Sequence, residues 1–94
     1  MPWEVTLRKK VIKALKSLPQ PVIAAFTLLL GELESSGPVR GNWPNYGKLN
    51  IDGRHHCHLK KGKPTYVAVW DDVSTGNSKK IEVEYVGTHE KAPY

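Results

Sequence analysis

The stretch YGKLNIDGRHHCHLKKGKPTYVAVW, residues 46–70, decides the fold of this chain of 94 residues. It begins with two extended patterns, YGKLNI and RHHCHLK, on either side of a turn or bulge at Asp52 and Gly53. The sequence KKGK then forms a turn into PTYVAVW, whose apolar residues occupy both sides, as expected for a central strand. The stretch therefore predicts strands joined in sequence as a meander.

Three of the four histidines and the only cysteine lie in RHHCHLK, residues 54–60. Successive side chains of a strand point to opposite faces of the sheet. The odd positions include Cys57 and Leu59 and are mostly apolar, although the sequence leaves open whether His55 is buried there or turns outward. The pattern predicts a core face and an opposite polar row, formed by Arg54, His56, His58 and Lys60.

This alternation argues against a metal site at the histidine cluster. Zinc needs three or four converging ligands, yet Cys57 points away from His56 and His58, and the chain has no second cysteine. A buried cysteine without a base on its own face is also a poor nucleophile. We therefore expect no metal site, which leaves the polar row as either a solvated surface or a surface that faces phosphate groups.

Two helices are predicted before the meander. The segment WEVTL, residues 3–7, alternates like a half-buried strand, and RKKVIKALKSL, residues 8–18, has an apolar stripe at helical spacing. Pro21 is suited to begin a second helix, and Gly37 to end it as a left-handed cap. The segment VRGNWPNY, residues 39–46, reads as a loop.

The last strand is predicted in IEVEYVG, residues 81–87, which follows a polar turn. Its alternation places Ile81, Val83 and Tyr85 inward, and Glu82 and Glu84 outward. Together the segments predict a single α+β domain over residues 1–94, in which two N-terminal helices pack on a small, mainly antiparallel twisted sheet in the order β-α-α-β-β-β. The position of the first strand within the sheet stays open.

Composition limits the classes of function. The chain has 39% hydrophobic and 24% charged residues, which is typical of a folded globular protein rather than a disordered tail. The net charge of +5 suits a polyanionic partner such as nucleic acid, or an acidic protein. One cysteine, no apolar leader and no apolar stretch of membrane-spanning length lead us to expect a cytoplasmic protein without membrane contact.

With LKSLP, a second helix, residues 46–70 and IEVEYVGTHEKAPY in this order, the chain resembles the RelE/ParE superfamily of bacterial toxin–antitoxin toxins, the RelE-like side in particular. The resemblance covers nearly the whole chain. It implies a RelE-like fold with a concave basic face on the sheet, and a neutralising cognate antitoxin. RelE-like members cleave mRNA in the ribosomal A site without metal or cofactor, whereas ParE-like members inhibit DNA gyrase.

The chain departs from this family at two motifs. Relatives usually have an arginine-rich YRLR-type strand where this chain has HHCH, so histidine stands where the family has catalytic arginine. They also end in a GHR…Y-type motif where this chain has GTHEKAPY, which keeps His89 and the terminal Tyr94. Direct transfer of the family's basic catalytic residues is therefore in doubt.

The resemblance implies a transesterification, for which we assign roles by side-chain chemistry. His89 is the candidate acid or base, and His56 and His58 are candidates for the second proton-transfer group or for phosphate ligands. Arg54 and Lys60 would stabilise charge, and Tyr94 would stack or donate a proton. The candidates for RNA contact are the basic Lys60, Lys61 and Lys63 and the aromatic Trp43 and Tyr46, which could stack on unpaired bases.

The resemblance, together with these assignments, implies a ribosome-dependent mRNA endonuclease that represses translation, uses no cofactor, and has the cognate antitoxin, mRNA and the ribosome as partners. Two alternatives remain. One is a ParE-like inhibitor that acts by binding gyrase, and the other is a relative without activity that binds only its antitoxin.

Overall fold

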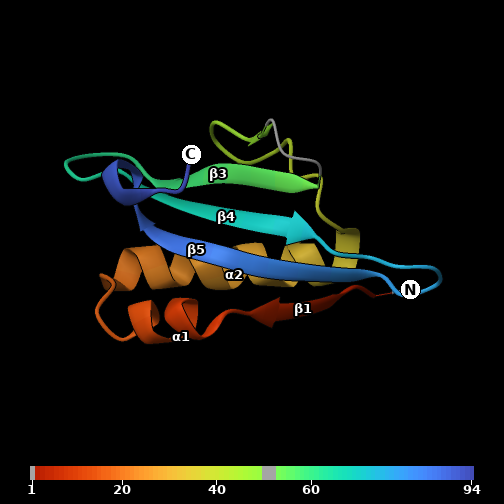
Figure 1. The fold of residues 1–94 in the computed structure, drawn as a ribbon. Coiled ribbons are helices and arrows are strands. Elements are labelled where there is room, and N and C mark those ends of the chain that lie inside the picture. Colours follow the sequence, from red (N-terminus) through yellow and green to blue (C-terminus); the bar gives the residue numbers. More distant parts are fainter. Residues whose placement is uncertain (1, 50–52) are drawn as a thin grey trace.

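The computed structural model describes residues 2–49 and 53–94 and contains helices and strands in the predicted order (Figure 1). The predicted residues Ile51 and Asp52 lie outside the described part. The elements are β1 (Glu4–Leu7), α1 (Lys9–Leu15), α2 (Gln20–Ser36), β2 (Gly47–Lys48), β3 (Arg54–Lys60), β4 (Tyr66–Asp72), β5 (Lys80–Thr88) and the short 3₁₀ helix η1 (His89–Lys91).

The sheet has the strand order β1-β5-β4-β3-β2. Strands β2 to β5 pair antiparallel, which confirms the predicted meander, and β1 pairs parallel with β5 from Glu4↔Lys80 to Leu7↔Val83. The first strand, whose place the sequence left open, therefore lies at an edge, beside the last strand. The α+β class and its mainly antiparallel sheet are confirmed.

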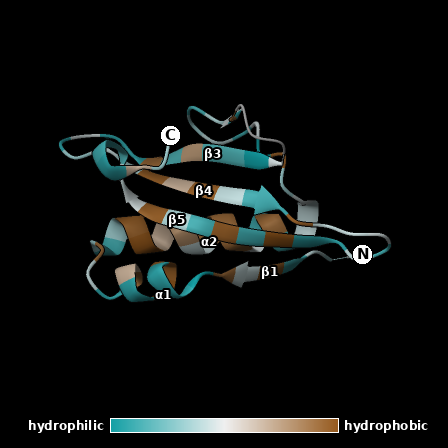
Figure 2. Ribbon diagram, in the orientation of Figure 1, coloured by the Kyte–Doolittle hydropathy of each residue, from teal (hydrophilic) through white to brown (hydrophobic). Residues whose placement is uncertain are grey.

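Helices α1 and α2 cover one face of the sheet, and the core lies between the two layers (Figures 1 and 2). Phe26, Leu29 and Leu33 of α2 pack there, because they recur at helical spacing on one side. Trp70 is fully buried, and its indole N–H donates to the carbonyl of Pro38 at 2.9 Å. Cys57 lies in this core, as the alternation of β3 predicts.

Helix α2 ends at Ser36, where Gly37 has φ +91° and donates its N–H to the carbonyl of Leu33. A Cβ atom at Gly37 would lie 2.9 Å from the indole of Trp3. The position therefore requires glycine for two reasons, its positive φ and the close approach of an aromatic ring. This confirms Gly37 as the cap, although its ψ of −172° lies outside the predicted left-handed helical conformation. None of the helices in the described ranges is long and apolar enough to cross a membrane.

Strand β5 differs from its predicted alternation because it contains a bulge. Val69 pairs with Tyr85 and Trp70 with Val83, so Glu84 is an extra residue on β5. After the bulge the inward position passes to Val86, and Tyr85 turns to the face without helices, which makes its predicted inward position wrong. We call this second face, which carries His56 and His58, the open face.

Candidate active site

Four rings come together at one end of the open face. Two belong to His56 and His58 of β3, the third to His89 of η1, and the fourth to Tyr94. The ring of Tyr94 stacks on His56 with 4.7 Å between centroids, and His89 meets His58 edge-on at 5.6 Å and Tyr94 edge-on at 5.8 Å. We call these residues the ring cluster. It joins the two histidines of the polar row to residues that lie more than thirty positions later in the chain.

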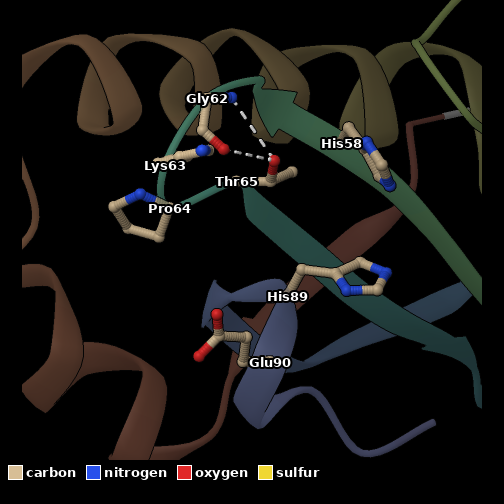
Figure 3. Close-up of a pocket in the computed structure, with 7 residues that line it drawn as sticks. All are labelled: His58, Gly62, Lys63, Pro64, Thr65, His89 and Glu90. Carbon is tan, nitrogen blue, oxygen red and sulfur yellow. Dashed lines mark hydrogen bonds between the residues drawn. The ribbon is translucent and has the colours of Figure 1, made fainter.

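A cavity of about 650 Å³ opens beside the ring cluster. The imidazoles of His58 and His89 lie on one side of it, and the turn between β3 and β4 lies on the other (Figure 3). The backbone N–H of His89 donates to the carbonyl of Thr65 at 2.8 Å, which fixes η1 beside that turn. The lining residues are His58, Gly62, Lys63, Pro64, Thr65, His89 and Glu90.

The two β3 histidines of the cluster favour their neutral form. Burial lowers the pKa of His56, and the nearby His58 and His89 lower it further. The pKa of His58 is also lowered, first by burial and then by His89 and Lys61. The Nδ1 atoms of both rings are buried and have no hydrogen-bond partner among the described residues. A neutral imidazole can accept a proton, which is what a general base must do. Because Nδ1 is buried, the nitrogen that could meet a substrate is Nε2.

The lowered pKa values predict a loss of stability in mild acid. Burial also lowers the pKa of His55, so three histidines of β3 bind protons more readily in the unfolded chain than in the folded one. Their contribution to stability is complete above the ordinary histidine pKa of 6.5 and decreases as the pH falls through the lower folded values. We expect the thermal midpoint to fall between pH 7.5 and 5.5, before most carboxylates titrate.

Thermal unfolding followed by circular dichroism in buffers of equal ionic strength would measure this fall. The His56→Gln variant should lose part of the pH dependence, because it removes one of the three titrating groups. A thermal midpoint that stays constant from pH 7.5 to 5.5 would contradict the expectation.

Arg54 shares the open face, but its guanidinium is bound to a carboxylate and not to the ring cluster. It lies two positions before His56 and four before His58, roughly 7 and 13 Å along the strand. Its guanidinium donates two hydrogen bonds, of 2.8 and 2.9 Å, to the carboxylate of Glu84, which is only 3% exposed. Arg8 also contacts Glu84, at 3.2 Å. The structure therefore places Arg54 in a buried ion pair with Glu84, and its role as a charge stabiliser in the reaction stays a prediction.

The aromatic candidates for RNA stacking also lie outside the cluster. Tyr46 packs against the core, stacks on His55 and shares a hydrogen bond of 2.7 Å with the Nδ1 atom of that ring. Trp43 is likewise packed against the core, and its indole donates to Glu32 at 2.9 Å. His55 is 4% exposed, so its ring, which the sequence left open as buried or outward, is buried and has Tyr46 as its partner.

The lysine candidates are all exposed, but only one of them lines the cavity. Lys63 does so from the turn, whereas Lys60 and Lys61 lie nearby without lining it. Reasoning from the sequence missed Thr65 and Pro64 as cavity residues. Gly62 and Pro64 mark a turn in the sequence, but no pattern there indicates that this turn adjoins η1.

The described residues contain no group of three or more His, Cys, Asp or Glu side chains that could hold a metal ion. Cys57 lies on the opposite face of β3 from His56 and His58, and burial raises the pKa of its thiol to about 12. A thiol with such a pKa stays protonated near neutral pH and does not act as a nucleophile.

The fold is that of the RelE toxins. The structure is similar to RelE in the archaeal RelE–RelB complex of Pyrococcus horikoshii OT3, with a TM-score of 0.70 and 22% identity over 98% of this chain and 100% of that one. It is also similar to a double arginine-to-alanine mutant of E. coli RelE in the free state, with a TM-score of 0.71 and 17% identity over 96% of this chain and 86% of the other.

No family model matches the sequence, and no curated protein matches it. At the identities of the two RelE structures the similarity defines the fold. The RelE-like architecture expected from the sequence is thus confirmed.

Proposed function

We propose that this chain is the toxin of a toxin–antitoxin system and represses translation as a ribosome-dependent mRNA endonuclease. One observation carries the proposal: the rings of His58 and His89 meet edge-on at a cavity on the open face, with 5.6 Å between their centroids, and Lys63 lines the same cavity. Two imidazoles and an ammonium group are sufficient for metal-independent cleavage of RNA. The RelE fold and the net charge of +5 support the same conclusion.

In the proposed mechanism His58 is the general base, because burial favours its neutral form. It accepts the proton of a ribose 2′-hydroxyl, and that oxygen attacks the adjacent phosphorus to form a 2′,3′-cyclic phosphate. His89, as an imidazolium, donates a proton to the departing 5′-oxygen. Lys63 stabilises the negative charge that develops on the phosphoryl oxygens.

His56 and Tyr94 have a separate role in this proposal. Burial raises the pKa of the Tyr94 phenol, so it remains protonated near neutral pH. Its ring and that of His56 already stack on each other, and Tyr94 is partly exposed. Together they offer a flat surface on which an unpaired base can stack beside the cavity.

The proposed partners follow from the same assignment. The archaeal RelE was solved as a complex with RelB, and we propose that a cognate antitoxin binds this chain as well. Two apolar side chains on the helices, Ile12 and Leu28, are 50% and 61% exposed and could form part of its contact surface. The target would be ribosome-bound mRNA, which places the activity in the cytoplasm.

A translation extract programmed with a defined message tests the activity. We expect cuts in the message only when ribosomes translate it, with 2′,3′-cyclic phosphate and 5′-hydroxyl ends on the fragments. Message without ribosomes is the control. An intact message together with blocked supercoiling by DNA gyrase would reject the nuclease in favour of a gyrase inhibitor, and fragments with 3′-hydroxyl ends would reject the mechanism.

A further inference from the structure

The loop from Val39 to Tyr46 lies along the outer edge of β3, on the side away from β4. The N–H of His58 donates to the carbonyl of Pro44 at 2.8 Å, and β2, which follows the loop, pairs Gly47 with His56. The loop and β2 thereby satisfy backbone groups that an edge strand would otherwise expose. His58, the proposed base, is one of the residues they hold.

A single carboxylate oxygen holds this loop to helix α2. The Oε1 atom of Glu32 accepts hydrogen bonds from the side chains of three loop residues: Arg40 at 3.2 Å, Asn42 at 2.9 Å and Trp43 at 2.9 Å. These hydrogen bonds, first that from Asn42, lower the pKa of Glu32, so the acceptor is ionised near neutral pH. We call Glu32 and its three donors the Glu32 anchor.

The loop and Gly47, the first residue of β2, together contact each of the three histidines in β3. Besides the bond to the backbone of His58, Tyr46 shares its hydrogen bond with the ring of His55. A Cβ atom at Gly47 would lie 3.2 Å from the Nε2 atom of His56, so this glycine lies close against that ring.

The contact at His58 matters most, because pairing with β4 becomes irregular directly after it. His58 pairs with Val67, but the next pair is Lys60 with Tyr66, so Leu59 interrupts the register. At such an irregularity the ladder to β4 constrains the strand less, so the hydrogen bond that His58 donates to the Pro44 carbonyl contributes more to fixing the backbone of His58.

We propose that Glu32 is a positioning residue for the cleavage reaction: it fixes the 39–46 loop, and through the Pro44 carbonyl it holds His58 in place against His89. Glu32 lies on the helix side of the sheet and contacts neither the cavity nor the ring cluster. The catalytic consequence of this inference rests on the proposed nuclease function. The structural link between Glu32 and His58 does not depend on it.

The Glu32→Leu variant tests the link, since leucine has a similar size and no acceptor. Amide hydrogen exchange measured by NMR should show the N–H of His58 exchanging about tenfold faster or more, because the loop detaches locally, while amides of the central strand β4 stay protected. Glu32→Gln keeps a carbonyl oxygen for Asn42 and Trp43, so its exchange should stay near that of the wild type. Glu34→Leu, the same change at an exposed position of α2, is the matched control.

The catalytic consequence is a separate measurement in the translation extract. Glu32→Leu should lower the cleavage rate at saturating message by about tenfold to a hundredfold, because a displacement of about 1 Å of a catalytic group has that effect. The concentration of message at half-maximal rate should stay unchanged, and Glu32→Gln should recover most of the rate.

Three outcomes would contradict the positioning link, its catalytic role or the proposed function. Unchanged exchange at His58 in Glu32→Leu overturns the positioning link, whatever the activity. Faster exchange with an unchanged cleavage rate overturns the catalytic role of that link. A wild-type protein that leaves the message intact overturns the proposed function instead, and the exchange data still decide whether Glu32 holds β3.

Discussion

Replacing Arg54 with alanine is expected to lower the free energy of unfolding by about 3–5 kcal/mol, since it removes one partner of a buried ion pair. The Glu84 carboxylate is 3% exposed and receives two hydrogen bonds from Arg54. After the substitution its remaining cation would be Arg8, whose side chain is 43% exposed and also contacts Glu82. A buried carboxylate that loses one cation keeps most of its desolvation penalty, and the water that can reach it does not compensate for the lost ion pair. Urea denaturation at pH 7 would measure the change.

Two comparisons separate this role of Arg54 from a role on RNA. Lys60→Ala removes an exposed positive charge from the same strand and should change stability by no more than about 0.5 kcal/mol. The double variant Arg54→Met with Glu84→Leu removes both charges and should recover much of the lost stability. An Arg54→Ala protein of wild-type stability that fails to cleave RNA would contradict the structural assignment and restore the catalytic one.

The alternation of β3 was sufficient to predict which side chains share a face and that Cys57 is buried, although it left the burial of His55 open. Cys57 lies in the core, and His56 and His58 lie together on the open face, because the period of a strand is fixed by its backbone. The apolar stripe of α2 and its end at Gly37 were equally local features, set by helical spacing and by the conformational freedom of glycine.

The features that the sequence did not predict have a common physical cause, which is that they depend on contacts between distant residues. The bulge at Glu84 inverts the alternation of β5, and no turn residue in IEVEYVG marks it. Tyr46 ends the polar loop and is a candidate for stacking in the sequence, while its hydroxyl shares a hydrogen bond with His55 in the folded chain. Arg54 belongs to the polar row, but a carboxylate from β5 neutralises it.

The candidate site shows both effects at once. The alternation of β3 predicted that His56 and His58 lie on one face. Their proximity to His89 and Tyr94 follows instead from the path of the chain after β5. The tail reaches the cluster because η1 is hydrogen-bonded to Thr65 at the start of β4. The residue types of the site could therefore be predicted, while the pairing of His58 with His89 required the fold.

The second large effect is expected at that pair: His58→Ala and His89→Ala should each lower the rate of message cleavage by about 10²- to 10⁴-fold, the usual contribution of general acid–base catalysis. Stability should change little, since both rings lie on the open face beside a cavity. Lys91→Ala, an exposed position of the same short helix η1, is the matched control and should cleave at the wild-type rate.

The double variant and the pH profile then decide whether the two histidines act together. If one imidazole accepts and the other donates the proton, removing both should cost about as much as removing either one, because the effects of groups that act as a unit are not additive. The pH dependence should be bell-shaped. Its acidic limb should fall below the ordinary histidine pKa of 6.5, because the proposed base, His58, has a lowered pKa and must be neutral to act. Single variants whose losses multiply in the double variant, or an acidic limb above pH 6.5, would mean that His58 is not the base.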